Sequence, residues 1–200
     1  MSRVDQTRAR ILDAATEEFA AHGIAGARID RIAERSGMSK PMIYTYFGGK
    51  AKLFDAVFDT HVIANSERVP FEAADLAGYA TRLYDAYLAD PALLRLVMWK
   101  RLERDGTGYL YPGLEETDAQ HLREIIAQQQ TDHIRDDLEP ADVWSLLIAT
   151  AATWAQGSIT AVATPNDPAD DHERRRSALG AYVAAALITE TSLRSQRPLT

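Results

Sequence analysis

The sequence of 200 residues contains no cysteine. Disulfide bonds, thiolate metal sites and cysteine nucleophiles are therefore excluded. No run of roughly 18 uninterrupted apolar residues is present, as a membrane-spanning helix would need. The N-terminal stretch MSRVDQTRARILDAA also lacks the apolar segment of a signal peptide. These absences predict a soluble, cytoplasmic protein without a membrane partner.

Enzyme motifs are missing as well. The sequence has no nucleophile elbow, no phosphate-binding glycine loop and no HExxH-type metal pair. His121 and His133 stand more than three helical turns apart, which does not suit a shared metal ion. We therefore expect no catalytic residue, no metal and no cofactor, and an enzyme with an accessory head is the weakest alternative.

The charge of the chain is acidic but uneven. The net charge is −7. Residues 1–66 carry nine Lys and Arg against eight Asp and Glu, whereas residues 67–200 carry thirteen against twenty-one. Within residues 28–52 there are six cations and two anions. A basic segment on an acidic body is a local electrostatic signal that does not identify a partner by itself.

Apolar residues recur at helical spacing along nearly the whole chain, and no alternating strand pattern of useful length is present. The first stripe ends near Gly23, where glycine can take a left-handed C-terminal position. Near the end of the sequence, one helix is predicted from Pro140 through Trp154, and the last carries Leu179 and Leu187. The class is all-α, with about nine helices.

Two domains are expected, with Pro70 near their boundary. Residues 1–66 form an N-terminal three-helix helix-turn-helix head with a connecting helix from residue 50. Residues 67–200 form a larger helical domain. The helix-turn-helix is indicated by a helix that ends at Gly37 and a second one that Ser39 begins as its N-cap.

The second helix of such a unit enters the major groove of DNA. Ile43 and Phe47 would face inward, which leaves the other side chains of this helix for DNA. Lysine and tyrosine can bind phosphates or base edges, and apolar groups can contact thymine methyls. The candidates are Lys40, Pro41, Met42, Tyr44, Thr45 and Tyr46.

Lys50 stands at the start of the connecting helix, where a cation opposes the helix dipole. A phosphate beside it, held also by helix N–H groups, would explain that position.

The string ILDAATEEFAAHGIAGARIDRIAERSGMSKPMIYTYFGGKAKLF resembles the DNA-binding region of the TetR/AcrR family of bacterial transcriptional regulators. The resemblance implies that Ser39 and the six candidates lie at the DNA surface, that Lys50 holds a phosphate and that Arg28 lies near the DNA backbone. Where the family often has a Thr or Ser cap, this chain has Ala27 and Arg28, and the lost cap costs about 1 kcal/mol of helix stability.

The resemblance also implies a dimer through the last two long helices, which are rich in small residues that allow close helix packing. The alternative is packing within one chain. The candidate interface residues are Trp144, Ile148, Ala152, Tyr182, Val183 and Leu187.

Relatives in this family bind small, often apolar effectors among their central helices, which directs attention to aromatic side chains. Each of these is also a candidate for ordinary core packing. The candidate pocket residues are Tyr79, Leu83, Tyr87, Met98, Trp99, Trp144 and Trp154.

The function expected is that of a homodimeric repressor, released from a palindromic operator on double-stranded DNA by an unknown small-molecule effector. The alternative is a DNA-binding regulator controlled by a protein partner, or an activator, without such an effector. A thermal-shift screen separates the two, because a tight ligand stabilises the fold.

Overall fold

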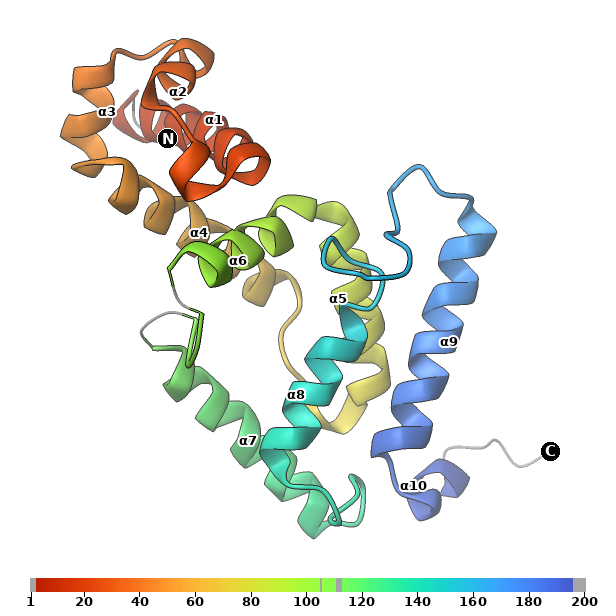
Figure 1. Cartoon of the computed structure of the whole chain (residues 1–200). Coiled ribbons are helices and arrows are strands. Elements are labelled where there is room, and N and C mark those ends of the chain that lie inside the picture. The colour runs from red at the N-terminus through yellow and green to blue at the C-terminus, as the bar shows by residue number, and fades with distance from the viewer. Residues whose placement is uncertain (1–2, 105, 111–112, 196–200) are drawn as a thin grey trace. The chain divides into compact units, whose positions relative to one another are not determined.

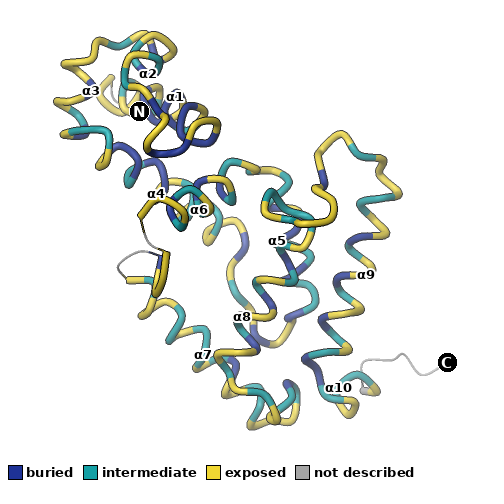
Figure 2. Tube along the Cα trace, viewed as in Figure 1, coloured by how far each residue is buried: buried dark blue, intermediate teal, exposed yellow. Residues whose placement is uncertain are grey.

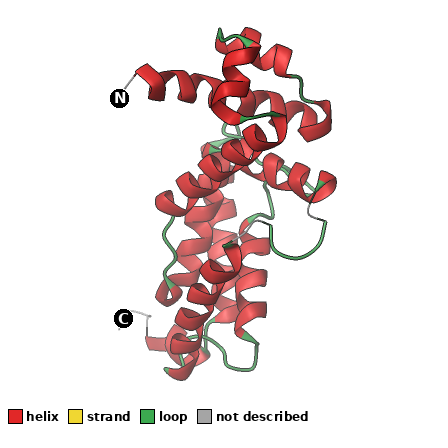
Figure 3. Ribbon diagram, turned by 90° about the vertical axis from the view of Figure 1, so that its left-hand side faces the viewer, coloured by secondary structure: helices red, strands yellow, loops and turns green. Residues whose placement is uncertain are grey.

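The computed structural model describes residues 3–104, 106–110 and 113–195. Helices make up the ordered elements of these ranges, and no strand is drawn in Figure 3 for the described part of the chain. The helices, labelled in Figure 1, are α1 (Arg3–Gly26), α2 (Ile29–Ser36), α3 (Lys40–Phe47), α4 (Lys50–Arg68), the 3-10 turn η1 (Ala73–Asp75), α5 (Leu76–Ala89), α6 (Pro91–Glu103), α7 (Leu114–Gln130), α8 (Pro140–Ala151), α9 (Ala169–Leu187) and α10 (Glu190–Ser195).

The all-α prediction is confirmed, with differences at the ends of helices. The short α10 was not predicted. The helix predicted to run through Trp154 stops at Ala151, because the next residues form tight turns in which the N–H groups of Thr153 and Ala155 donate three residues back. No helix in the described ranges is both long and apolar enough to cross a membrane.

The chain forms two compact units. The N-terminal unit comprises residues 1–65 and 90–110, and the C-terminal unit comprises residues 66–89 and 111–200. The boundary near Pro70 inferred from the sequence therefore differs from this division in one respect. Helix α6 lies beyond it in sequence but packs within the N-terminal unit.

The core of the N-terminal unit is made by large apolar side chains of α1 to α4. Phe19 and Phe54 meet edge to face with their ring centroids 5.2 Å apart. As predicted, Ile43 and Phe47 of α3 are buried, and Ile32 of α2 is buried with them. Burial of this kind is the main force that fixes the short helices α2 and α3 against α1 and α4.

Helix α6 is tied to α1 by polar contacts as well as by packing. The indole N–H of Trp99 donates to the carbonyl oxygen of Ala20 (3.2 Å). After the end of α6, the guanidinium of Arg104 lies 5.0 Å from the ring centroid of Phe54 and donates to Asp55 (2.6 Å). Cation–π and charged contacts of this type hold the helix in one register.

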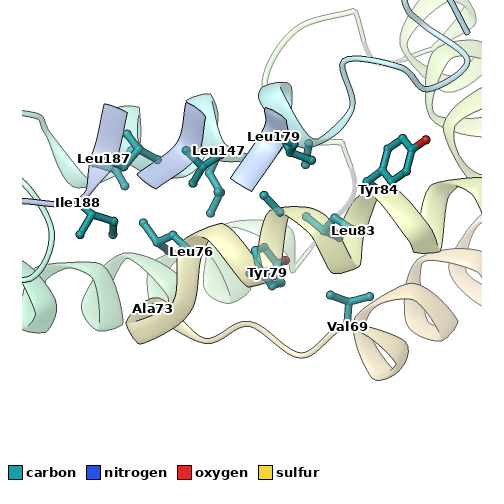
Figure 4. Packing of buried hydrophobic residues seen from close by; sticks show 14 of the residues in the cluster. Val69, Ala73, Leu76, Tyr79, Leu83, Tyr84, Leu147, Leu179, Leu187 and Ile188 are labelled. Carbon is teal, nitrogen blue, oxygen red and sulfur yellow. The ribbon is translucent and has the colours of Figure 1, made fainter. Parts of the chain in front are cut away.

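The core of the C-terminal unit is built around α5. Figure 4 shows Leu76 and Leu83 of α5 together with Leu147 of α8 and Leu179 and Leu187 of α9. All five are at most 3% exposed. Their spacing of seven or eight residues places each pair on one face of its helix.

Candidate nucleic-acid interface

The turn between α2 and α3 has the geometry of a helix-turn-helix. Gly37 ends α2 in the left-handed conformation (φ 68°, ψ 25°), and the N–H of Met38 donates to the carbonyl oxygen of Ala33. Ser39 then begins α3, since its side chain accepts a hydrogen bond from the N–H of Met42 (3.4 Å). These are the features that the sequence predicted from Gly37 and Ser39.

Helix α3 presents most of its residues to solvent, as Figure 2 shows. Tyr44 is 50% exposed and Met42 is 40% exposed, while Tyr46 is half-buried. The hydroxyl of Thr45 donates to the carbonyl oxygen of Pro41 (2.9 Å). Because the hydroxyl hydrogen is used within the helix, the exposed Thr45 side chain presents its methyl group and an oxygen acceptor to solvent.

A basic hollow of about 460 Å³ opens beside α3. Four of the predicted DNA-binding side chains line it, namely Arg28, Lys40, Tyr44 and Lys50. Asp30 lines it too and forms an ion pair with Lys40. The fold thus brings together cations from α2, α3 and α4 that are spread over 23 positions of the sequence.

Glu18 of α1 takes the place of the missing cap of α2. The Arg28 side chain makes no capping hydrogen bond. Instead, the buried carboxylate of Glu18 accepts the N–H of Arg28 (2.9 Å) and the Nε–H of Arg31 (2.8 Å). Burial by itself would raise the pKa of Glu18, but the hydrogen bonds from Arg31 and Arg28, with the charge of Arg31, hold that pKa below 4.5. Glu18 therefore supplies the hydrogen bond that a side-chain cap of α2 would have made, and offsets the loss of helix stability that the sequence predicted.

Lys50 has partners inside the protein. Its ammonium donates to the carbonyl oxygens of Ala25 (3.0 Å) and Ala27 (3.1 Å). These carbonyls lie at the end of α1, where the helix dipole is negative. The position of Lys50 at the start of α4 is thus compensated within the fold, and the phosphate invoked from the sequence is not needed to explain it.

Sequence reasoning missed Glu18, which binds the backbone of Arg28 and the side chain of Arg31, and Asp30, which pairs with Lys40. The signal for Glu18 was its position beside Phe19 in an apolar stripe, since a carboxylate buried there needs a partner. Asp30 left no such signal, because acidic residues are common in the first turn of a helix.

The residues predicted to line one effector pocket are divided between the two units of the chain. Trp144 belongs to a cluster of rings with Phe71 (5.0 Å between centroids), Tyr79 (6.2 Å) and His121 (4.5 Å). Phe71 and His121 were not predicted. Burial lowers the pKa of His121 and raises that of Tyr79, so both are neutral near pH 7.

Other pocket candidates have packing roles. Leu83 is buried in the core, and Trp154 packs edge to face on Tyr84 outside α8. Burial raises the pKa of Tyr87 to about 12. Trp99 and Met98 belong to the N-terminal unit, where Trp99 anchors α6 on α1.

The proposed dimer residues lie along α8 and α9, which pack side by side. Val183 and Leu187 are nearly fully buried within the single chain, where they line a hollow together with Leu146 and Tyr182. Ile148 and Ala152 are partly buried. The large exposed apolar side chains are Tyr182 (63%) and Leu146 (51%), of which Leu146 was not predicted.

A groove of about 390 Å³ runs along the same face, lined by Thr150, Thr153, Trp154, Ala178, Leu179 and Tyr182.

Among the described residues, no three His, Cys, Asp or Glu side chains are grouped so that they could hold a metal ion.

Comparison with known proteins agrees with this geometry. The family of bacterial regulatory proteins, tetR family, matches residues 11–57, and the tetracyclin repressor-like C-terminal domain matches residues 75–184. An HTH-type transcriptional repressor of Streptomyces coelicolor is 40% identical over 154 residues, which cover 76% of this chain and 79% of that protein.

Two further relatives extend the comparison. The HTH-type transcriptional repressor NicS of Pseudomonas putida is 30% identical over 134 residues, which cover 63% of this chain and 59% of NicS. A crystal structure solved for another Streptomyces coelicolor protein, described as a transcriptional regulator, has a TM-score of 0.79 and 38% identity over 90% of this chain and 98% of that one. The chain therefore belongs to the TetR family of bacterial transcription regulators, which bind DNA and are not enzymes.

Proposed function

We propose that this protein is a homodimeric repressor, acting in the bacterial cytoplasm, that binds a palindromic operator and leaves it when a small-molecule effector binds. The observation that carries the DNA-binding part is the basic hollow. Three cations and a phenol line one opening next to an exposed helix, and such groups suit phosphate oxygens. Repression itself is supported by the two relatives named as repressors.

Each predicted DNA-binding residue has a role in this proposal. Arg28, Tyr44 and Lys50 hold phosphates, and Tyr46 supports them from its half-buried position. Lys40 shares its ammonium between Asp30 and the DNA. The exposed Pro41, Met42 and Thr45 lie against base edges, led by the N-terminus of α3 that Ser39 begins.

The C-terminal unit serves pairing and sensing in this proposal. A palindrome requires a two-fold symmetric protein. The exposed Leu146 and Tyr182, which line one hollow together with Thr150 and Ala186, supply an apolar face for a second copy.

The effector site that we propose is confined to the aromatic cluster of the C-terminal unit, with Tyr79, Trp144 and His121 at its centre and Tyr87 near it. Rings with neutral polar groups suit an uncharged, partly aromatic molecule.

Selection of bound fragments from the source genome tests the DNA-binding proposal. Purified protein at moderate salt should retain fragments that share a palindrome, with half-sites about one helical turn or a multiple of it apart. The variant Arg28→Ala/Tyr44→Phe keeps α3 intact and should bind the recovered fragment about tenfold more weakly or worse. Recovery of fragments without a shared palindrome would contradict the proposal.

A further inference from the structure

One peptide residue at the end of α1 is held from two sides by charged groups. The N–H of Ala25 donates to Oε2 of Glu103 on α6 (2.7 Å), and the carbonyl oxygen of Ala25 accepts from Nζ of Lys50 on α4 (3.0 Å). The three helices involved, α1, α4 and α6, all belong to the N-terminal unit. Both bonds include a full charge, and such hydrogen bonds are about twice as strong as neutral ones.

The backbone at Gly23 makes this arrangement accessible. Gly23 has φ 70° and ψ −175°, a conformation that is essentially restricted to glycine. This kink interrupts α1 and turns the N–H of Ala25 toward α6. A Cβ at Gly23 would stand 2.8 Å from the indole of Trp99 and would also meet the Glu103 carboxylate. Glycine thus allows α6 to approach closely enough for Glu103 to reach Ala25.

Lys50 connects this turn to the DNA-facing surface. Its ammonium has three N–H bonds, and two of them are directed to Ala25 and Ala27. The same side chain lines the basic hollow, so that its third N–H is available to an anion there. The carbonyls of the turn therefore set where this ammonium stands.

We propose that Glu103 is a positioning residue for Lys50, acting through Ala25 without touching DNA. Glu103 fixes the turn, the turn fixes the ammonium of Lys50, and the ammonium meets a DNA phosphate. This inference rests on the proposed DNA binding.

The test compares Glu103→Gln with the charge-matched control Glu34→Gln, an exposed residue of α2. The probe is a duplex of unrelated sequence at low salt, because phosphate contacts are independent of sequence. Loss of a negative charge by itself strengthens binding to DNA, as expected for Glu34→Gln. Glu103→Gln should instead weaken binding about fivefold and lower the salt slope by about one unit.

A double-mutant cycle with Lys50→Met identifies the route. In the Lys50→Met background, Glu103→Gln should have no further effect on affinity, because the group that it positions is gone. In NMR spectra recorded without DNA, the amide proton resonance of Ala25 should move upfield from wild type to Glu103→Gln. The thermal unfolding midpoints of these two proteins should be equal.

Additive losses in the cycle, or binding by Glu103→Gln that is as tight as in the control, overturn the assignment of Glu103. An unchanged Ala25 amide resonance overturns it as well, without reference to DNA. Failure of the wild-type protein to bind any duplex is a different result, because it removes the proposed function together with this inference.

Discussion

At the scale of single residues, Glu18 shows how one carboxylate organises the start of α2 beside the basic hollow. It is fully buried, and it holds the backbone of Arg28 and the side chain of Arg31. Arg28 is itself one of the cations of the basic hollow. A fully buried residue therefore fixes the backbone of one of the residues that we propose to face DNA.

Replacement of Glu18 by glutamine should lower the free energy of unfolding by about 2 kcal/mol, because a buried, charge-assisted acceptor is lost. The folded-state pKa of Glu18 lies below its ordinary value of 4.5, so its contribution is fully present above pH 4.5 and disappears as the pH falls through the folded-state pKa. Urea unfolding of both proteins at several pH values should show the difference shrinking toward low pH.

The neighbouring residue supplies the control for this experiment. Glu17 pairs with Arg35 at 3.3 Å, but both side chains are largely exposed. Exposed pairs contribute little, so Glu17→Gln should change the unfolding free energy by about 0.5 kcal/mol or less. A difference between wild type and Glu18→Gln that persists unchanged at low pH would show that the carboxylate charge is not the source of the stability.

At the scale of elements, the geometry of α3 predicts which part of the Thr45 side chain sets the preference for a base pair. The hydroxyl of Thr45 donates its hydrogen to the carbonyl oxygen of Pro41, and we propose that its methyl group is the part that contacts DNA. Thr45→Val keeps that methyl and should preserve half-site preference, whereas Thr45→Ser removes it and should change the preference by about 1 kcal/mol at one base pair. Binding to a library of single-base operator variants measures both.

The opposite pattern would place the hydroxyl on DNA. In that case Thr45→Ser would keep the wild-type preference and Thr45→Val would lose it.

Helix α3 and its caps could be predicted because their causes are local. Gly37, Ser39 and Pro41 each act within one turn of the chain, and the burial of Ile43 and Phe47 follows from a spacing of four residues. The contact between Ala25 and Glu103 joins residues 78 positions apart, and no local rule reports it.

The effector-pocket prediction had less physical support, since it rested on aromatic character alone. Trp99 satisfied that criterion, yet its indole packs on Gly23 and its N–H is bound to Ala20. A core tryptophan and a pocket tryptophan have the same preference for apolar surroundings. Only the three-dimensional neighbours can distinguish them.

At the scale of the whole molecule, pairing through α8 and α9 is open to a direct test. The double variant Leu146→Glu/Tyr182→Glu places like charges on both copies of an apolar face. It should shift the protein to monomers in analytical ultracentrifugation and weaken operator binding about 100-fold, because the two half-sites would then be bound independently.

The control variant is Ile126→Glu, which changes an apolar side chain of α7 that is 40% exposed. It should leave both the mass in solution and operator affinity unchanged. A monomeric wild-type protein, or a double variant that still sediments as a dimer, would exclude this surface as the interface.

The grouping of α6 with the N-terminal unit bears on how new regulators can be assembled from parts. A fusion that exchanges only residues 1–66 would leave Phe54 without the guanidinium of Arg104, and Gly23 without the indole beside it. The transplantable piece is therefore discontinuous: residues 1–65 together with residues 90–110. A chimera built from both segments carries its own Trp99 and Glu103, whereas a single cut near Pro70 joins a DNA-binding surface to a foreign α6 with no partner for its kinked first helix.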